Sequence, residues 1–422
     1  MRPVTSTYFT KAAPGERARA PLQGPVLLVV AVAAGIAGCG NNPVPEELET
    51  PAKAGAMLPR LSSDPAGVPW LSWIEPDGEG QVLRFASLGQ DGWSPARTAA
   101  RGTGWFLNWA DFPSVVHLGE GRLAAHWLRK VEGGPYAYEV VMSVSADGGE
   151  RWTAPATPHG DGTATEQVFV RLYAVPGGAG AVWLDGRHTA GGEHGEEHHA
   201  TRGAMTLRAG GLDTSGHALP EHELDARVCD CCSTAAAASS HGTTVVYRGR
   251  TVAEVRDIRA VTLGPDGWSA PVPVGDEGWV MPACPVNGPA LAASGELLAT
   301  AWFTAAQDRP RVLAAFSKDG GRSWTPSVEV ASGTPLGRVA IVMPDARSAV
   351  VSWLEQAADG AEIRYRRVPM QGRPASVHTL ATTSPARSSG FPQMALAGDR
   401  LVFAWTRVGE SADIVSAAVP LP

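Results

Sequence analysis

The chain lacks a basic surplus, a long apolar segment and an abundance of cysteine. Its net charge of -7 over 422 residues is a poor match for nucleic acid or for an anionic membrane surface. Its one long apolar run, residues 26–37, is shorter than the roughly 20 residues of a transmembrane helix. Of only five cysteines, four lie beyond the N-terminal region. These absences leave one large soluble body as the expected product.

The N-terminal region has basic residues, then the apolar run, then Ile36-Ala37-Gly38-Cys39. This pattern resembles a bacterial lipoprotein signal with its lipobox. The resemblance implies that residues 1–38 are a signal peptide, that Cys39 carries the lipid, and that residues 39–43 form a lipidated tether. It also implies attachment to the membrane in the cell envelope, at the outer membrane if the source is a diderm bacterium, because Gly40 follows the cysteine. Removing residues 1–38 changes the formal charge from -7 to -10.

Beyond the tether, a short apolar segment that ends in an aromatic residue recurs seven times, at intervals of 51 to 64 residues. One four-stranded sheet with its connections occupies a period of this length. The repeat therefore predicts an all-β protein with a seven-bladed β-propeller over residues 44–422. The aromatic residues are Trp73, Trp127, Trp183, Tyr247, Trp302, Trp353 and Trp405.

The second repeat unit illustrates the expected blade. Residues 112–118, 122–128 and 138–144 are predicted strands A, B and C, and strand D begins at residues 153–155. The last unit ends after its strand C, whereas residues 44–50 resemble the segment that precedes the fourth unit. We therefore expect an N-terminal strand from residues 44–50 to close the last blade and remove a free edge.

Two turns, at residues 145–152 and 317–324, share the pattern Ser-x-Asp-Gly-Gly-x-x-Trp. The carboxylates of Asp147 and Asp319 are expected to accept backbone N–H bonds, and the tryptophans to pack between neighbouring sheets. These turns resemble the Asp-box of the sialidase-like (BNR-repeat) β-propellers, which implies a structural role for both aspartates. Because sialidases of that family have six blades, a six-bladed ring with one irregular unit is the alternative.

All four remaining cysteines are expected on one face of the ring. In an antiparallel meander, the D-to-A and B-to-C loops lie on the face opposite the Asp-box turns. Cys229, Cys231 and Cys232 precede the fourth unit, and Cys284 precedes the fifth. Adjacent blades should thus bring these thiols together at the mouth of the channel.

A histidine-containing loop, residues 188–202, is expected on the same face one blade away. It contains His188, His194, His198 and His199. Thiolates favour Cu(I), and mixed thiolate and imidazole sets favour zinc, so the cysteines and histidines are candidate ligands for copper or zinc. The alternatives are two structural disulfides, because an exported protein meets an oxidising compartment, and a solvated histidine loop.

Arginines and acids also fall in the loops assigned to this face. Sialidases that resemble this fold grip a carboxylate with three arginines, and they use a Tyr–Glu pair and an Asp in catalysis. Their Phe-Arg-Ile-Pro sequence is absent, since Leu58-Pro59-Arg60-Leu61 is only a weak echo, and no tyrosine matches by motif. No catalytic role is therefore transferred. The unassigned catalytic candidates are Arg187, Arg256, Asp257, Arg338, Asp111 and Asp185, with Arg387 and Glu254 nearby.

Three functions follow as hypotheses. The first is an exported lipoprotein whose propeller is a ligand-binding module with a cysteine-rich metal site. The second is a sialidase-like exo-glycosidase that uses the arginines and carboxylates, with a glycan or small molecule as substrate and Trp109 as a sugar platform or as a cover for the core. The third is a scaffold for a protein partner. Simple sialosides are expected to be turned over weakly or not at all.

Overall fold

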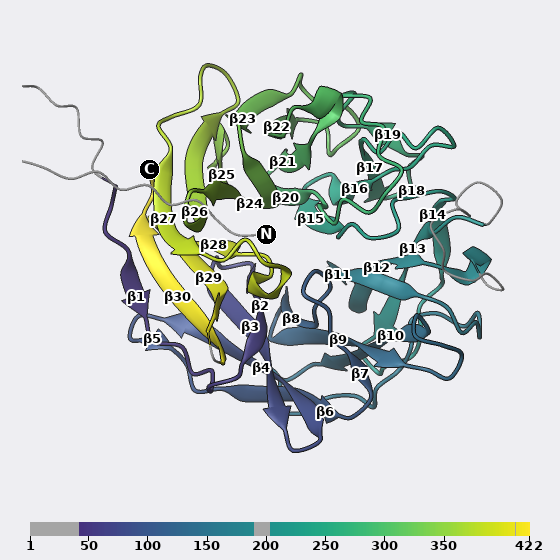
Figure 1. Cartoon of the computed structure of the whole chain (residues 1–422). Helices are drawn as coiled ribbons and strands as arrows, with labels where there is room; N and C mark the ends of the chain where they lie inside the picture. Colours follow the sequence, from purple (N-terminus) through teal and green to yellow (C-terminus); the bar gives the residue numbers. More distant parts are fainter. Residues whose placement is uncertain (1–41, 190–202, 410) are drawn as a thin grey trace, which may run out of the picture. The chain divides into compact units, whose positions relative to one another are not determined.

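Seven antiparallel sheets follow one another along the chain and form a closed ring (Figure 1). The computed structural model describes residues 42–189, 203–409 and 411–422, which all belong to one unit. Within these ranges the regular structure is strand and three short 3-10 helices, η1 (Arg187–Thr189), η2 (Ala306–Asp308) and η3 (Arg387–Ser389). No helix of the described part is long and apolar enough to cross a membrane. The predicted all-β fold and its seven blades are confirmed.

The blades are numbered in chain order, each from its inner strand outward. Blade 1 consists of β2 (Met57–Ser63), β3 (Pro69–Asp77), β4 (Gly80–Gly89), β5 (Gly92–Trp93) and β6 (Arg97–Gly102). Blade 2 consists of β7 (Trp105–Phe106), β8 (Ser114–Gly119), β9 (Arg122–Lys130) and β10 (Tyr138–Ser145). Blade 3 consists of β11 (Gln167–Val175), β12 (Gly178–Asp185), β13 (Thr206–Asp213) and β14 (His222–Asp225). Blades 4 and 5 consist of β15 (Ala235–Ser239), β16 (Gly242–Arg248), β17 (Ile258–Gly264), β18 (Gly267–Trp268) and β19 (Val272–Pro273); and β20 (Ala290–Ser294), β21 (Leu297–Thr304), β22 (Arg311–Ser317) and β23 (Val328–Ser332). Blades 6 and 7 consist of β24 (Pro335–Asp345), β25 (Ser348–Ala357), β26 (Gly360–Pro369) and β27 (His378–Thr383); and β28 (Gln393–Ala397), β29 (Arg400–Val408), β30 (Ala412–Pro420) and β1 (Glu46–Leu48).

The N-terminal strand closes the last blade, as the sequence predicts. Strand β1 pairs antiparallel with β30, with Glu46 opposite Ala418 and Leu48 opposite Ser416. In Figure 1 the purple β1 lies beside the yellow β30. The pairing covers an edge of β30 that would otherwise offer unpaired backbone groups to other chains.

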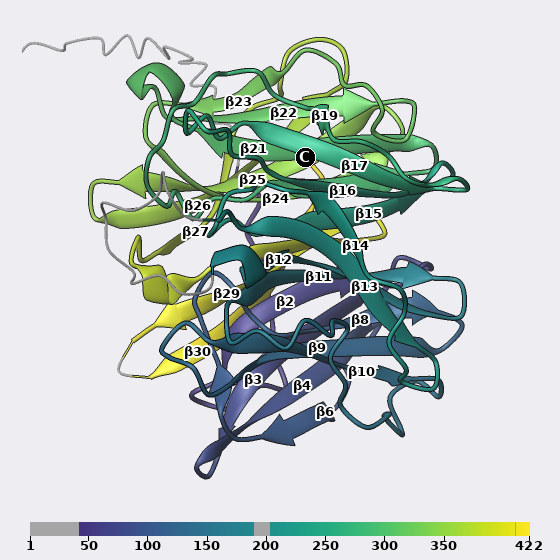
Figure 2. The ribbon, with the colours of Figure 1, turned by 90° about the vertical axis from the view of Figure 1, so that its right-hand side faces the viewer.

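The core consists of layers between neighbouring blades. Inner strands contact one another around the ring, and Figure 2 shows the ring from the side of blade 3. Each of the seven recurring aromatic residues lies on the second strand of its blade and is buried. In three blades the indole also donates a hydrogen bond to an acid two residues later, as Trp353 does to Glu355 at 2.6 Å. The repeat thus encodes both the packing layer and a buried polar anchor.

The two Asp-box turns fold as expected and attach each blade to its predecessor. Asp147 Oδ1 accepts from the backbone N–H of Arg151 at 2.9 Å, and Asp319 Oδ1 accepts from that of Ser323 at 2.9 Å. Gly149 has a φ of 87°, and a Cβ there would lie 2.7 Å from Phe85 of blade 1, so the turn requires glycine. The turns are therefore structural inter-blade contacts.

Two local predictions are wrong. Residues 153–155 do not form a strand, because the Thr153 side chain and backbone bond to Val144, and only an isolated bridge, Met142 to Ala156, continues the sheet. Arg338 was expected in a loop but lies within β24, at a point where the pairing with β25 shifts register. Both positions are places where side-chain bonding or a bulge replaces a regular ladder.

Candidate metal centre

Three of the cysteines lie in the loop from β14, the outer strand of blade 3, to β15, the inner strand of blade 4. The backbone of this loop is fixed at both ends. Cys229 N–H donates to the Arg248 carbonyl at 3.0 Å, and the Thr234 hydroxyl donates to the Phe169 carbonyl at 3.1 Å. The thiols are thus presented from a loop anchored to two neighbouring blades.

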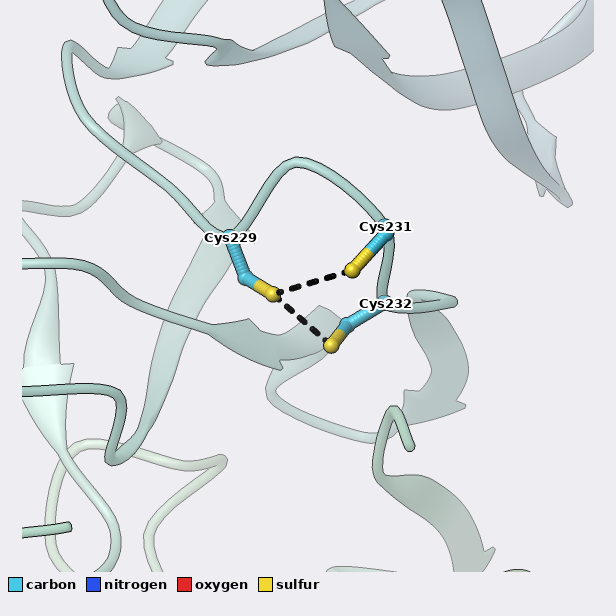
Figure 3. Close-up of side chains that lie close together, drawn as sticks. All are labelled: Cys229, Cys231 and Cys232. Atoms are coloured by element: carbon cyan, nitrogen blue, oxygen red, sulfur yellow. Dashed lines mark hydrogen bonds between the residues drawn. The ribbon is translucent and has the colours of Figure 1, made fainter. Parts of the chain in front are cut away.

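Cys229, Cys231 and Cys232 point toward one another (Figure 3). Their sulfur atoms all lie within 4.8 Å of each other, with Cys229 Sγ 4.0 Å from Cys231 Sγ and 2.8 Å from Cys232 Sγ. All are free thiols, and the 2.8 Å separation exceeds the roughly 2.05 Å of a disulfide bond. Cys229 and Cys232 are buried, whereas Cys231 is half-buried.

The fourth thiol comes from the next blade, as predicted. Cys284 lies in the loop between β19 and β20 and is exposed, and its interaction with Cys231 lowers the pKa of the Cys284 thiol. It does not belong to the compact group of three sulfurs. Three of the four predicted thiols thus form a compact group, and the fourth lies on the loop of the adjacent blade.

A buried arginine supports the sulfur group. Arg256, from the B-to-C loop of blade 4, donates through Nη1 to Cys229 Sγ at 3.2 Å and through Nη2 to Glu254 at 2.9 Å. Glu254 is shared with Arg250, which also binds the Asp230 carboxylate at 2.9 Å. Two guanidinium groups thus face two carboxylates beside the thiols, so the network is neutral before any thiol ionises.

The proton affinities of the thiols diverge. Although burial opposes it, hydrogen bonds with Cys231 and Cys232 and the charge of Arg256 hold the pKa of the Cys229 thiol well below its usual range. Hydrogen bonds with Cys229, Cys232 and Cys284 raise the pKa of Cys231 instead, and burial raises the pKa of Cys232. The directions of these shifts make Cys229 the thiol of the group that ionises most readily.

Backbone strain surrounds the thiols. Phe169, Glu254 and Val286 have φ values of 55°, 60° and 48°, which side chains of these types rarely adopt. Phe169 accepts from Thr234, two residues after Cys232; Glu254 binds Arg256; Val286 is two residues after Cys284. Such strain typically gathers at functional sites.

The histidines are not part of this group where they are described. His188 is exposed, and its Nε2 lies 3.8 Å from a Glu223 oxygen on the outer strand β14. His194, His198 and His199 lie outside the described residues, as do residues 1–38 and Cys39. Among the residues described, the group that could hold a metal ion consists of cysteines alone.

The catalytic candidates are distributed over separate places. Arg187 forms a fork with Asp185, at 2.7 and 2.8 Å, and also pairs with Glu221. Asp257 accepts from two backbone N–H groups, those of Gly278 and Trp279. Most of these groups already have structural partners.

Arg338 and Trp109 hold loops together. The Arg338 guanidinium donates to the Ser389 hydroxyl at 2.8 Å and to the Gly390 carbonyl at 2.9 Å, and it lies 5.0 Å from the centre of the Trp109 ring. Trp109 also stacks on Phe391, and Arg387 lies 5.9 Å from its ring. Trp109 therefore covers other side chains of these loops, and its role as a sugar platform stays a prediction.

A small cavity brings the candidate Asp111 together with His126 and Arg171, which the sequence did not single out. It is lined by Arg60, Asp111, His126 and Arg171, and its volume is about 20 Å³. Burial raises the pKa of Asp111 to about 7 and lowers that of Arg171 to about 10. No hydrogen bond or ion pair within the described ranges joins Arg171, whose Nε is buried. The space holds about one water molecule, far below the roughly 300 Å³ of a sugar-sized site.

A larger groove lies between blades 4 and 5, with a volume of about 630 Å³. Its lining includes Glu277, Gln307, Arg311 and Trp324. Burial raises the pKa of Glu277, and Gln307 has a φ of 55°. The sequence carried no signal for this groove beyond the Asp-box tryptophan.

No protein-family model matches the chain, and no curated protein matches it in sequence. Among solved structures, it is similar to a Hadza microbial sialidase (14% identity, TM-score 0.37, covering 71% of this chain and 63% of that one). It is also similar to a Trypanosoma rangeli sialidase mutant with trans-sialidase activity (13% identity, TM-score 0.44, covering 78% of this chain and 56% of that one). A third similar structure is a phage phi92 endosialidase (11% identity, TM-score 0.48, covering 90% of this chain and 69% of that one). The chain spans less than two thirds of the length of the first two, and these likenesses concern the fold alone. By its own sheet order and turns, the chain is a sialidase-like, seven-bladed β-propeller.

Proposed function

We propose that this protein is a lipid-anchored binding module of the cell envelope whose propeller holds a soft metal ion, copper or zinc, at Cys229, Cys231 and Cys232. The observation that carries the proposal is the convergence of three thiols within 4.8 Å on one anchored loop. Soft thiolate ligands select Cu(I) and zinc over harder cations. The anchor at Cys39 remains part of the proposal and rests on the lipobox pattern.

One sulfur pair has the spacing of a shared ion, and a second pair is closer. A tetrahedral zinc with Zn–S bonds of about 2.3 Å separates its sulfurs by about 3.8 Å. Cys229 Sγ and Cys231 Sγ are 4.0 Å apart, whereas Cys229 Sγ and Cys232 Sγ are 2.8 Å apart and would have to separate by about 1 Å to share an ion. Arg256 supports binding because its charge favours a thiolate at Cys229.

Disulfides are the competing use of the same thiols. The contacts would pair Cys229 with Cys232 and Cys231 with Cys284. That arrangement would consume all four thiols and leave no metal ligand. The two uses therefore make opposite predictions for free thiol and for metal content.

The test is elemental analysis with thiol counting on mature protein purified anaerobically under reducing conditions. We expect about one copper or zinc per chain, which Cys229→Ser abolishes while the fold is retained. His188→Ala is the matched control, because His188 is exposed and pairs with Glu223, and it should leave the metal content unchanged. Protein without metal and without free thiol under native conditions would contradict the proposal and establish the disulfides.

A second candidate function is the binding of a polar ligand in the groove between blades 4 and 5. Its volume of about 630 Å³ lies in the range of small-molecule sites, and no partner within the described residues binds the Arg311 guanidinium. An acidic oligosaccharide suits an arginine beside the Trp324 ring. Arg311→Met should abolish binding of such a ligand in calorimetry, whereas Arg309→Met, whose side chain is outside the lining, should not. Turnover of sialosides is expected to be weak or absent.

A further inference from the structure

The four thiols form a gradient from solvent to core. Cys284 is exposed, Cys231 is half-buried, and Cys229 and Cys232 are 0% and 1% exposed. Cys284 also comes from a different loop, between β19 and β20, than the other three. Its position therefore differs from theirs in both accessibility and origin.

The contacts follow the same order. Cys284 lies near enough to Cys231 for that thiol to lower the pKa of its own, and Cys231 lies 4.0 Å from Cys229, which lies 2.8 Å from Cys232. Cys284 stands outside the compact three-sulfur group. The half-buried Cys231 thus connects the exposed thiol to the two buried ones.

The loop that carries Cys284 is held firmly. Val280 bridges to Val255, and the Met281 N–H donates to the Glu254 carbonyl at 2.9 Å. At the other end, the Asn287 carbonyl accepts two hydrogen bonds from the buried Arg248. A firmly held loop keeps an exposed thiol near Cys231 without the entropy cost of ordering it.

Exposed apolar side chains accompany this thiol. Val280 is 61% exposed in the same loop, and Val252 is 85% exposed in the loop that contacts it through Val255. Apolar side chains beside an exposed metal ligand suit the approach of a protein surface better than that of a hydrated ion.

The number of sulfurs favours Cu(I) as the ion. A closed structural zinc site requires four protein ligands, and the compact group supplies three, with no imidazole or carboxylate within the described group. An all-sulfur set of three is a soft donor set of the kind that Cu(I) prefers.

We propose that Cys284 captures Cu(I) from a protein that carries it on an exposed thiolate or thioether, and passes it through Cys231 to the buried thiols. This inference rests on the proposed metal-binding function. At each step a new Cu–S bond forms before the old one breaks, and copper stays Cu(I). Each receiving thiol that joins the ion releases one proton to solvent, and a departing thiolate takes one up.

The experiment measures anaerobic transfer of Cu(I) from its glutathione complex, a small thiolate donor, to the reduced mature protein. Cys284→Ser should still bind one Cu(I), with an affinity within about threefold of the unsubstituted protein. Its transfer rate should fall by about tenfold or more, because the accessible attacking thiol is gone. Ala283→Ser, an exposed neighbour in the same loop, should transfer at the unsubstituted rate.

Three outcomes have distinct meanings. A Cys284→Ser protein that transfers at the unsubstituted rate would overturn the relay. A Cys284→Ser protein that loses copper at equilibrium would also overturn it, by making Cys284 a permanent ligand. An unsubstituted protein that binds no Cu(I), with Cys229→Ser indistinguishable from it, would refute the metal-binding function itself.

Discussion

Replacing Arg256 with glutamine should change the pH dependence of metal binding rather than its strength at every pH. Arg256 Nη1 lies 3.2 Å from Cys229 Sγ, and the glutamine amide ends two bonds nearer the backbone, so both the hydrogen bond and the positive charge are lost. A nearby positive charge lowers the pKa of a thiol, so the pKa of Cys229 should rise when that charge is removed.

The sign follows from proton competition. Where Cys229 is protonated, the ion must displace a proton, and each unit of raised pKa weakens apparent binding by up to about tenfold, which is about 1.4 kcal/mol. Where Cys229 is already ionised, the raised pKa has no effect, and the loss of a nearby positive charge should leave binding of a cation equal or tighter. The profiles of the two proteins should therefore cross as pH rises.

The assay is competition against a chelator between about pH 5 and 9, with Arg250→Gln as the matched control. Arg250 shares Glu254 with Arg256 but does not contact sulfur, so its substitution should not shift the profile in the same way. Affinity reduced by the same factor at every pH in Arg256→Gln would refute the electrostatic role and indicate lost structure instead.

Three further predictions concern stability. Trp353→Phe should lower the free energy of unfolding by about 1.5–3 kcal/mol more than Trp405→Phe, measured by chemical denaturation. The reason is that Trp353 donates a hydrogen bond to the buried Glu355, whereas Trp405 has no such bond among the described residues. Equal losses of unfolding free energy in the two variants would contradict this. Asp111→Asn should remove part of the pH dependence of stability. The pKa of Asp111 in the folded protein, about 7, lies above its unfolded value, so the protonated carboxyl stabilises the fold below about pH 4 and this stabilisation is lost as the pH rises to about 7. Melting curves of both proteins below and above this pH range would test it. Deleting residues 42–49 should lower stability by a few kcal/mol and promote association of the exposed β30 edge, measured by unfolding and light scattering; a monomer of unchanged stability would contradict the closure.

The ring was predictable from sequence because its determinants are periodic. One aromatic residue per period on the second strand fixes the register of each blade, and the register decides which loops share a face. The position of Cys284 beside Cys231 followed from that register alone, since both precede an inner strand. The same reasoning identified the N-terminal strand as the partner of β30.

The surroundings of the thiols were not predictable, because they depend on local departures from the repeat. Arg256 reaches Cys229 from a loop in which Glu254 adopts a positive φ, and no sequence pattern announces that conformation for a glutamate. Arg171 lines the cavity after a register shift between Val168 and Arg171 in β11. A bulge redirects the side chains that follow it, so a strict alternation of faces fails there.

The bulge in β11 also links the small cavity at Asp111 to the loop that carries the three thiols. Phe169 lies in it, its N–H donates to Asp111 Oδ2 at 2.7 Å, and its carbonyl accepts from Thr234, two residues after Cys232. A phenylalanine at a φ of 55° is costly by itself, so both hydrogen bonds are needed to hold it. Movement of the thiol loop that displaces Thr234 would therefore weaken the support for Phe169 and, through it, the hydrogen bond to Asp111. Coupling between sites is reciprocal. Protonation of Asp111 near pH 7 should therefore change the conformational equilibrium of the thiol loop by the same free energy with which a movement of that loop changes the protonation of Asp111.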